Sequence, residues 1–131
     1  MRILIVEDSY MERKGLKKLL EPYGDCEVAP TGEIAFEIYR IAQQESEKIG
    51  LVTVDINMPG MSGFDLIERI RQHEVSLGKK YDEYTRILMI TISANFKDVT
   101  SSYEKGCAYY CVKPVNADNL AHALKEVGVI P

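Results

Sequence analysis

Arg2-Ile3-Leu4-Ile5-Val6-Glu7-Asp8 is an apolar run that ends in two adjacent acids, and the same pattern recurs later in the chain. Leu51–Val54 runs into Asp55, and Tyr109–Val112 runs into Lys113. The carboxyl ends of parallel strands meet at one edge of a sheet, where open α/β sheets bind their ligands. Three carboxylates and one ammonium at such an edge predict a site for a divalent cation and a phosphoryl group.

Strand and helix patterns alternate along the chain, which is typical of βα units around a parallel sheet. Strands are predicted at residues 2–6, 26–29, 51–54, 86–91 and 108–112. The helices are expected to begin after Ser9, after Thr31, after Ser62, at residue 96 (ending at 105) and after Asn116. Glu12 and Asp65 stand three residues after two of these serines, which predicts capping boxes. The predicted fold class is α/β, with a doubly wound, five-stranded parallel sheet.

Apolar residues at helical spacing predict the buried face of each helix. These residues are Leu16, Leu19 and Leu20, then Ile34, Ile38 and Ile41, then Leu66, Ile67 and Ile70, and finally Leu120, Leu124 and Val127. Gly106 is expected to end the fourth helix in a left-handed conformation. Residues 74–85 lack clean periodicity, so we expect a helix end followed by a surface loop.

Length and composition favour one domain over residues 1–131, with a core over 1–127 and a short tail over 128–131. The net charge of −4 and pI near 5.2 argue against a nucleic-acid surface, which needs a basic patch. No apolar run reaches the roughly 20 residues that span a bilayer. The start of the chain does not resemble a signal peptide. Cys26, Cys107 and Cys111 lack metal-binding spacing and suggest reduced thiols. A cytoplasmic location is therefore expected.

The adjacent acids Glu7 and Asp8 repel each other unless a proton or a cation intervenes. Taken alone, the pair fits a solvated loop. Asp55 makes a cation site the better interpretation, because it follows a second buried strand at the same edge. Oxygen ligands with room for water suit Mg²⁺, which in such sites normally also holds a phosphate oxygen. Asp55 can act as a ligand, as a nucleophile that forms an aspartyl phosphate, or as both.

Lys113 carries a point charge suited to a phosphoryl oxygen, and Pro114 restricts its backbone to an extended conformation. A surface lysine is the simpler alternative. Ser93, after the fourth strand, fits two interpretations equally well: a donor to a phosphoryl oxygen, or a turn and helix cap. Tyr110 is by default an ordinary strand aromatic, although its rotamer can change if its surroundings move.

Four motifs occur in order along nearly the whole chain. They are Ile5-Val6-Glu7-Asp8-Ser9 with Arg13, Val54–Gly63, Ile92-Ser93-Ala94 and Gly106–Pro114. Together they resemble the motifs of the receiver domain of two-component response regulators. The resemblance implies a flavodoxin-like (βα)5 fold with strand order 2-1-3-4-5. It also implies a cis peptide bond between Lys113 and Pro114.

The resemblance assigns a role to each candidate residue. Asp55 would accept the phosphoryl group and Lys113 would bind it. Ser93 would be the switch hydroxyl, and Tyr110 would be the aromatic residue whose rotamer follows Ser93. Asp8 and Asp55 would bind Mg²⁺ together with the backbone carbonyl of Asn57, and Glu7 would contribute through water. Two features depart from the family pattern. Residues 72–86 form a longer connection than usual, and position 93 is Ser where Thr is frequent.

The expected function is a signalling switch that catalyses only its own phosphorylation and dephosphorylation. A sensor histidine kinase or a phosphotransfer protein would be the donor. A downstream protein would bind the face formed by residues 96–105, the fifth strand and the last helix. We expect no direct binding of nucleic acid or membrane, because the sequence contains no helix-turn-helix and no membrane span.

Other interpretations are weaker. An aspartate-nucleophile phosphatase would have a second acid two residues after Asp55, where this chain has Asn57. A flavodoxin-like cofactor carrier would need a phosphate-cradling loop after the first strand, where Glu7 and Asp8 would repel phosphate. Within the receiver interpretation, the chain can be a free-standing protein, a phosphorelay intermediate, or part of a longer regulator or hybrid kinase.

Overall fold

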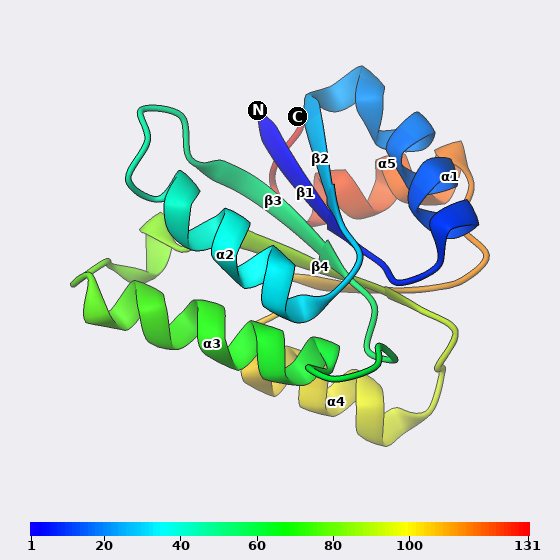
Figure 1. Ribbon diagram of the computed structural model, residues 1–131. Helices are drawn as coiled ribbons and strands as arrows, with labels where there is room; N and C mark the ends of the chain where they lie inside the picture. The colour runs from blue at the N-terminus through cyan, green and yellow to red at the C-terminus, as the bar shows by residue number, and fades with distance from the viewer.

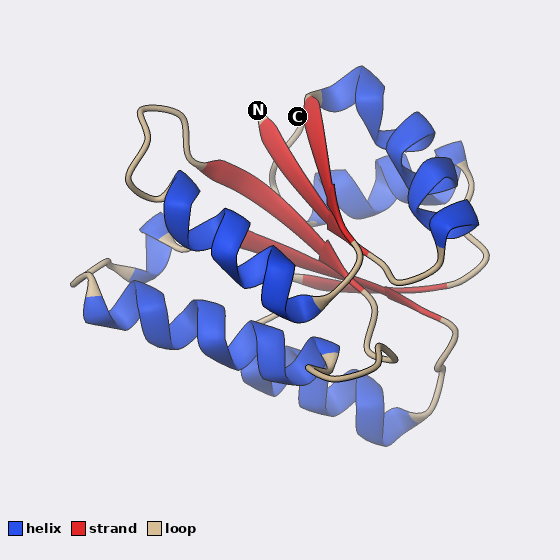
Figure 2. Ribbon diagram, viewed as in Figure 1, coloured by secondary structure: helices blue, strands red, loops and turns tan.

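A computed structural model describes all 131 residues and shows a parallel sheet between two layers of helices (Figures 1 and 2). The strand order is β2-β1-β3-β4-β5, and every neighbouring pair is parallel, which confirms the predicted fold. The strands are β1 (Arg2–Val6), β2 (Asp25–Ala29), β3 (Ile49–Val54), β4 (Arg86–Thr91) and β5 (Tyr109–Val112). The sheet order reverses direction beside β1 and β3, which places these two central strands at the ligand-binding crevice.

The helices divide between the two faces of the sheet. They are α1 (Tyr10–Leu20), α2 (Gly32–Ala42), α3 (Gly63–Ser76), α4 (Phe96–Lys105) and α5 (Ala117–Glu126). Helices α1 and α5 cover one face, and α2, α3 and α4 cover the other (Figure 1). One hydrophobic core joins Leu16, Leu20, Leu120 and Leu124 to alternate residues of the central strands. The second core lies under α2 and α3 and includes Ile67.

The predicted buried stripe of α2 was wrong. Ile34 and Ile41 are 46% and 51% exposed, and the helix buries Ala35, Phe36, Tyr39 and Ala42 instead. Both stripes have helical spacing, so periodicity alone did not separate them. The observed face combines small residues, which let the helix approach its neighbours closely, with two aromatic rings that bury a large area.

Two caps and one close contact position the loops at the carboxyl edge. Ser62 forms the predicted capping box with Asp65. Ser9 accepts a hydrogen bond from the backbone N–H of Glu12, but the Glu12 side chain does not return to complete the predicted box. Gly63 begins α3 against the strand end, and a Cβ atom there would lie 2.4 Å from the carbonyl oxygen of Asp55.

The connection from α3 to β4 is a surface loop only in its middle. A short 3₁₀ helix spans Tyr81–Glu83, and Tyr81 is strongly exposed. The predicted helix end is confirmed, because α3 continues to Ser76. Glu74 within it is buried, and Thr85, predicted to lie in the surface loop, is buried as well. Thr85 donates its backbone N–H to Glu74 (2.6 Å) and its hydroxyl to the carbonyl of Ile49 (2.8 Å), which fixes the loop against the sheet.

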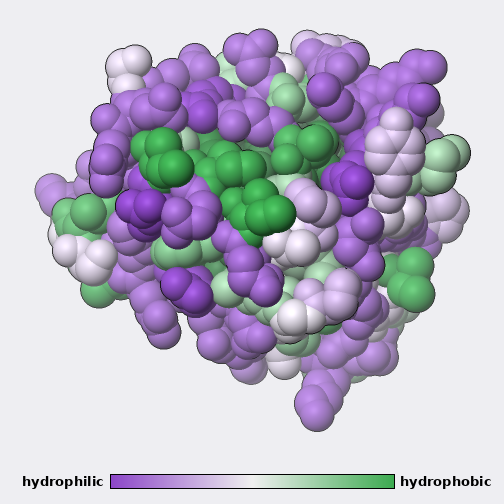
Figure 3. Space-filling model, in the orientation of Figure 1, coloured by the Kyte–Doolittle hydropathy of each residue, from purple (hydrophilic) through white to green (hydrophobic).

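Two further expectations about the backbone are confirmed. Gly106 ends α4 with a φ of 107°, and the Lys113-Pro114 peptide bond is cis. All three cysteines are free. None of the helices has both the length and the apolar character needed to cross a bilayer. Figure 3 shows the face viewed in Figure 1 as mainly hydrophilic, with a group of hydrophobic residues near its middle.

Candidate metal and phosphoacceptor site

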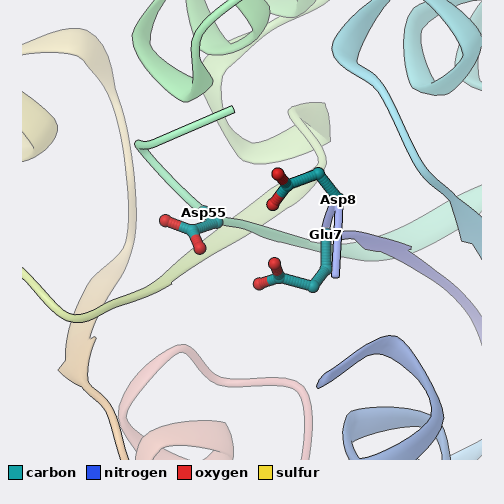
Figure 4. Close-up of side chains that lie close together, drawn as sticks. All are labelled: Glu7, Asp8 and Asp55. Atoms are coloured by element: carbon teal, nitrogen blue, oxygen red, sulfur yellow. The ribbon is translucent and has the colours of Figure 1, made fainter. Parts of the chain in front are cut away.

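The acids that end two central strands converge at the carboxyl edge of the sheet. Glu7 and Asp8 follow β1, and Asp55 follows the neighbouring β3. One carboxylate oxygen from each residue lies within 4.8 Å of the other two, and Figure 4 shows the carboxylates of Glu7 and Asp8 pointing toward Asp55. Glu7 and Asp55 are buried, whereas Asp8 is exposed to solvent. The arrangement leaves one side of the cluster open to solvent.

Lys113 enters this cluster from the end of β5, and its ammonium is mostly buried. Its Nζ donates to Glu7 Oε2 at 2.7 Å and to Asp55 Oδ2 at 2.8 Å. It also lies 3.1 Å from Oε2 of Glu12. The structure therefore rejects the simpler interpretation of Lys113 as a solvated surface lysine.

The buried carboxyls differ in protonation. Burial raises the pKa of Glu7 to about 8, although Lys113 and the Ser9 N–H act against this rise. Burial also opposes ionisation of Asp55, but Lys113, the Asn57 N–H and the Thr91 hydroxyl outweigh it and lower the pKa of this carboxyl. Asp55 is consequently an ionised carboxylate at neutral pH, as a nucleophile must be.

Backbone and side-chain hydrogen bonds hold the acid-bearing loops in place. Arg13 donates through Nη1 to the carbonyl oxygens of both Glu7 and Asp8, at 2.9 Å each. The Asn57 N–H donates to Oδ1 of Asp55 at 3.0 Å. The carboxylate of Asp55 thus has one oxygen on a backbone donor and the other on Lys113.

The Ser93 hydroxyl belongs to the cap of α4 in this structure. It donates to Oδ2 of Asp98 at 2.6 Å and accepts from Asn95 at 3.0 Å. Thr91 offers a second hydroxyl beside Asp55. It is the last residue of β4 and is fully buried. Its hydroxyl makes no hydrogen bond, but it lies near enough to Asp55 to lower the pKa of that carboxyl.

Strand geometry explains why sequence reasoning missed Thr91. Asp55 stands one residue beyond β3, and the register pairs Val54 with Met89. Continued by one residue, this register puts Ile90 level with Asp55, so Thr91 lies one residue beyond that level and Ser93 lies three residues beyond it, in the loop. Choosing the hydroxyl next to the strand's final apolar residue would have selected Thr91.

Tyr110 connects the fifth strand to the loop after β4. Its hydroxyl donates to the carbonyl oxygen of Ser93 at 2.7 Å, and its ring packs partly buried against the core under α2 and α3. Sequence reasoning linked Tyr110 to Ser93, and the structure shows this link through the backbone carbonyl.

The donor set fits Mg²⁺. All candidate ligands are oxygens, from Glu7, Asp8 and Asp55, and the exposed side of the cluster leaves room for water. Cys111, in the last strand, is buried in the core under α1 and α5 and contributes no sulfur ligand to the acidic cluster. The acidic cluster therefore favours a hard, octahedrally coordinated cation.

These features together are those of a receiver domain: a (βα)5 sheet, an acidic pocket at its switch point, a buried lysine and a neighbouring hydroxyl. The model of the response regulator receiver domain matches residues 3–125, and the chain belongs to this family of two-component signalling domains. Receiver domains bind Mg²⁺ at an acidic pocket and interact with histidine kinases or phosphotransfer proteins.

Similarity to individual proteins agrees with this membership. A chemotaxis protein CheY homolog of Campylobacter jejuni is 29% identical over 97% of this chain and 92% of its own length. A structure of a CheX–CheY–BeF3–Mg complex from Borrelia burgdorferi has a TM-score of 0.82 at 26% identity, covering 97% of this chain and 88% of that one. TrrA of Thermotoga maritima, in complex with Mg²⁺–BeF, has a TM-score of 0.75 at 29% identity, covering 96% of this chain and 97% of that one. Other curated relatives are longer, and the chain spans only 7–56% of their length.

Proposed function

We propose that this protein is a phosphorylation-dependent switch that accepts a phosphoryl group on Asp55 from a histidine kinase or a phosphotransfer protein. The observation that carries the proposal is an ionised Asp55 paired with a buried Lys113, beside two further carboxylates. The ion pair of Asp55 and Lys113 is already balanced in charge without Glu7 and Asp8. Their excess negative charge is the feature that calls for a cation.

Oxygens of Asp8 and Asp55 would hold Mg²⁺, with the Asn57 carbonyl and with Glu7 through water. The bound cation would neutralise charge on the phosphoryl oxygens. An oxygen of Asp55 attacks phosphorus, the bond from phosphorus to the donor's imidazole nitrogen breaks, and that nitrogen keeps the electron pair. Lys113 stays beside the transferred group as a fixed charge. The Thr91 hydroxyl, which has no partner in the unphosphorylated protein, donates to a phosphoryl oxygen.

The chemistry is limited to the protein's own phosphorylation and dephosphorylation. Asn57, two residues after Asp55, supplies no carboxylic acid for rapid turnover of outside substrates. Water then hydrolyses the acyl phosphate and resets Asp55. Turnover of a small phosphoester, measured with catalytic amounts of protein, would instead favour a phosphatase.

The phosphoryl group would change the surface formed by α4, β5 and α5. Thr91 moving toward the phosphoryl group pulls on the β4–α4 loop, which Tyr110 holds through the Ser93 carbonyl. A change in that loop therefore reaches β5 directly. A downstream protein would detect this face, in keeping with a two-state switch.

Asp55→Asn tests the assignment. With acetyl phosphate and Mg²⁺, the wild-type protein should gain one acid-labile phosphoryl group, detected by intact-protein mass spectrometry, and the variant should gain none. Asp118→Asn, at the exposed start of α5, is the control and should label as the wild type does. Full labelling of Asp55→Asn would disprove the proposed phosphoacceptor.

A further inference from the structure

We propose that Glu12 is a placeholder for the phosphoryl group: its carboxylate occupies Lys113 in the unphosphorylated protein and leaves when a phosphoryl oxygen arrives. Glu12 therefore weakens the affinity of the site for a phosphoryl group. The inference rests on the proposed function, because it concerns the same Lys113. It adds a residue of α1 that the metal and phosphoacceptor site did not include.

Three carboxylates surround the ammonium of Lys113 in the unphosphorylated protein: two accept hydrogen bonds from it, and the third, that of Glu12, forms an ion pair with it. An ammonium group carries three N–H donors. The distances from Nζ are 2.7 Å to Glu7, 2.8 Å to Asp55 and 3.1 Å to Glu12. A phosphoryl oxygen that approaches the third donor of Lys113 must compete with the Glu12 carboxylate, which lies 3.1 Å from Nζ.

Glu12 is the carboxylate that leaves at the lowest cost. Glu7 is 1% exposed, and without Lys113 it would be a buried and poorly compensated carboxyl. Asp55 is the acceptor itself and stays in the site. The Glu12 side chain is 45% exposed, its contact is the longest of the three, and water can solvate it after release.

The position of Glu12 has no competing structural explanation. Only its backbone N–H takes part in the Ser9 cap, and its side chain turns away from the helix start toward Lys113. Glu12 and Lys113 also line a surface hollow with Leu16, Ile92 and Pro114. This hollow gives the released side chain space to move without unfolding α1.

Removing the charge of Glu12 should raise the affinity of the site for a phosphoryl group in two ways. It frees a donor of Lys113, and it removes a negative charge near the incoming dianion. An exposed ion pair of this kind contributes little, so the expected gain in affinity is about two- to fivefold. Salt screens partly exposed charges, and the gain should therefore shrink as ionic strength rises.

Beryllofluoride binding in the presence of Mg²⁺ is the measurement. The half-saturating beryllium concentration, followed by protein NMR at fixed fluoride and Mg²⁺, should be two- to fivefold lower for Glu12→Gln than for the wild type. Glu12→Ala, which leaves no acceptor for Lys113, should show at least the same gain. Glu21→Gln removes one charge beyond the other end of α1 and should bind as the wild type does.

The outcomes separate this inference from the proposed function. If the wild type binds beryllofluoride and Glu12→Gln binds equally or more weakly, the placeholder role is wrong. A gain that persists unchanged in 1 M salt would also overturn it, because the effect would not be electrostatic. If the wild type neither binds beryllofluoride nor labels with acetyl phosphate, the proposed function itself fails. Matching thermal unfolding midpoints would show that the variants are folded.

Discussion

Two buried clusters of charge lie at opposite edges of the same sheet, and they differ in how completely their groups are paired. At the amino edge, Arg71 donates to Glu74 (2.6 Å), to the Thr85 carbonyl (3.0 Å) and to the Gly106 carbonyl (2.7 Å). The second oxygen of Glu74 accepts the Thr85 N–H at 2.6 Å. At the carboxyl edge, three carboxylates share the single ammonium of Lys113.

This difference separates a structural cluster from a functional one. The amino-edge cluster has one cation for one anion, and backbone groups occupy their remaining donors and acceptors. It joins α3, the 74–85 connection and the end of α4. The carboxyl-edge cluster has excess negative charge, an exposed acid and a buried hydroxyl without a partner. Excess negative charge is thus the physical mark of the site.

The largest effect on stability is expected at the amino edge. Glu74→Gln leaves one acceptor oxygen for two donors, so the amide NH₂ must face either Arg71 or the Thr85 N–H. Breaking a buried ion pair in this way should lower the free energy of unfolding by about 3 kcal/mol in urea titrations. Glu68→Gln breaks the exposed pair with Lys105 and should cost about 0–1 kcal/mol. Equal effects of the two variants would mean that the amino-edge cluster stabilises the protein no more than an exposed ion pair does.

Lys113→Ala should affect chemistry more than folding. Loss of a donor positioned for developing charge should slow labelling by acetyl phosphate about 100-fold or more, measured as an initial rate. Stability should fall less than in Glu74→Gln, because Glu7 already holds a proton at neutral pH and Asp55 keeps the hydrogen bond from the Asn57 N–H. Lys105→Ala removes an exposed lysine and is the matched control. A labelling rate within about threefold of the wild type would contradict the role given to Lys113.

The carboxyl edge should also be the pH-sensitive one. The folded protein holds the Glu7 proton up to about pH 8, whereas the unfolded chain releases it near the ordinary pKa of 4.5. The folded state binds more protons between these values, so the free energy of unfolding falls as pH rises from about 4.5 to 8. Urea titrations without divalent metal should show this slope. Glu7→Gln should flatten it, and an unchanged slope would mean that another group is responsible.

The smallest expected effects distinguish the two hydroxyls. Ser93→Ala should cost about 1 kcal/mol of stability through the α4 cap and leave beryllofluoride binding unchanged. Thr91→Val should cost little stability, because it replaces a buried hydroxyl without a partner by a similar shape. It should nevertheless weaken beryllofluoride binding. The reverse pattern, measured by urea titration and NMR, would restore Ser93 as the switch hydroxyl.

Much of the fold was predictable because its signals are local. The five strands, the Ser62 capping box and the end of α4 at Gly106 follow from runs, spacing and residue types. The stripe of α2 was not predictable in this way, because Ile34 and Ala35 begin two stripes of equal periodicity. Only the shape of the sheet and of α3 selects between them. A cytoplasmic location and the division into a core and a tail stay predictions.

By itself, the sequence determined the α/β architecture and the meeting of Glu7, Asp8, Asp55 and Lys113, because each follows a strand and parallel strands end at one edge. Tertiary structure alone decided the identity of the hydroxyl beside Asp55 and the attachment of Glu12 to Lys113. The burial of Glu74 was likewise decided only there. These features depend on strand register and on side-chain contacts between distant segments, which residue types and spacing do not specify.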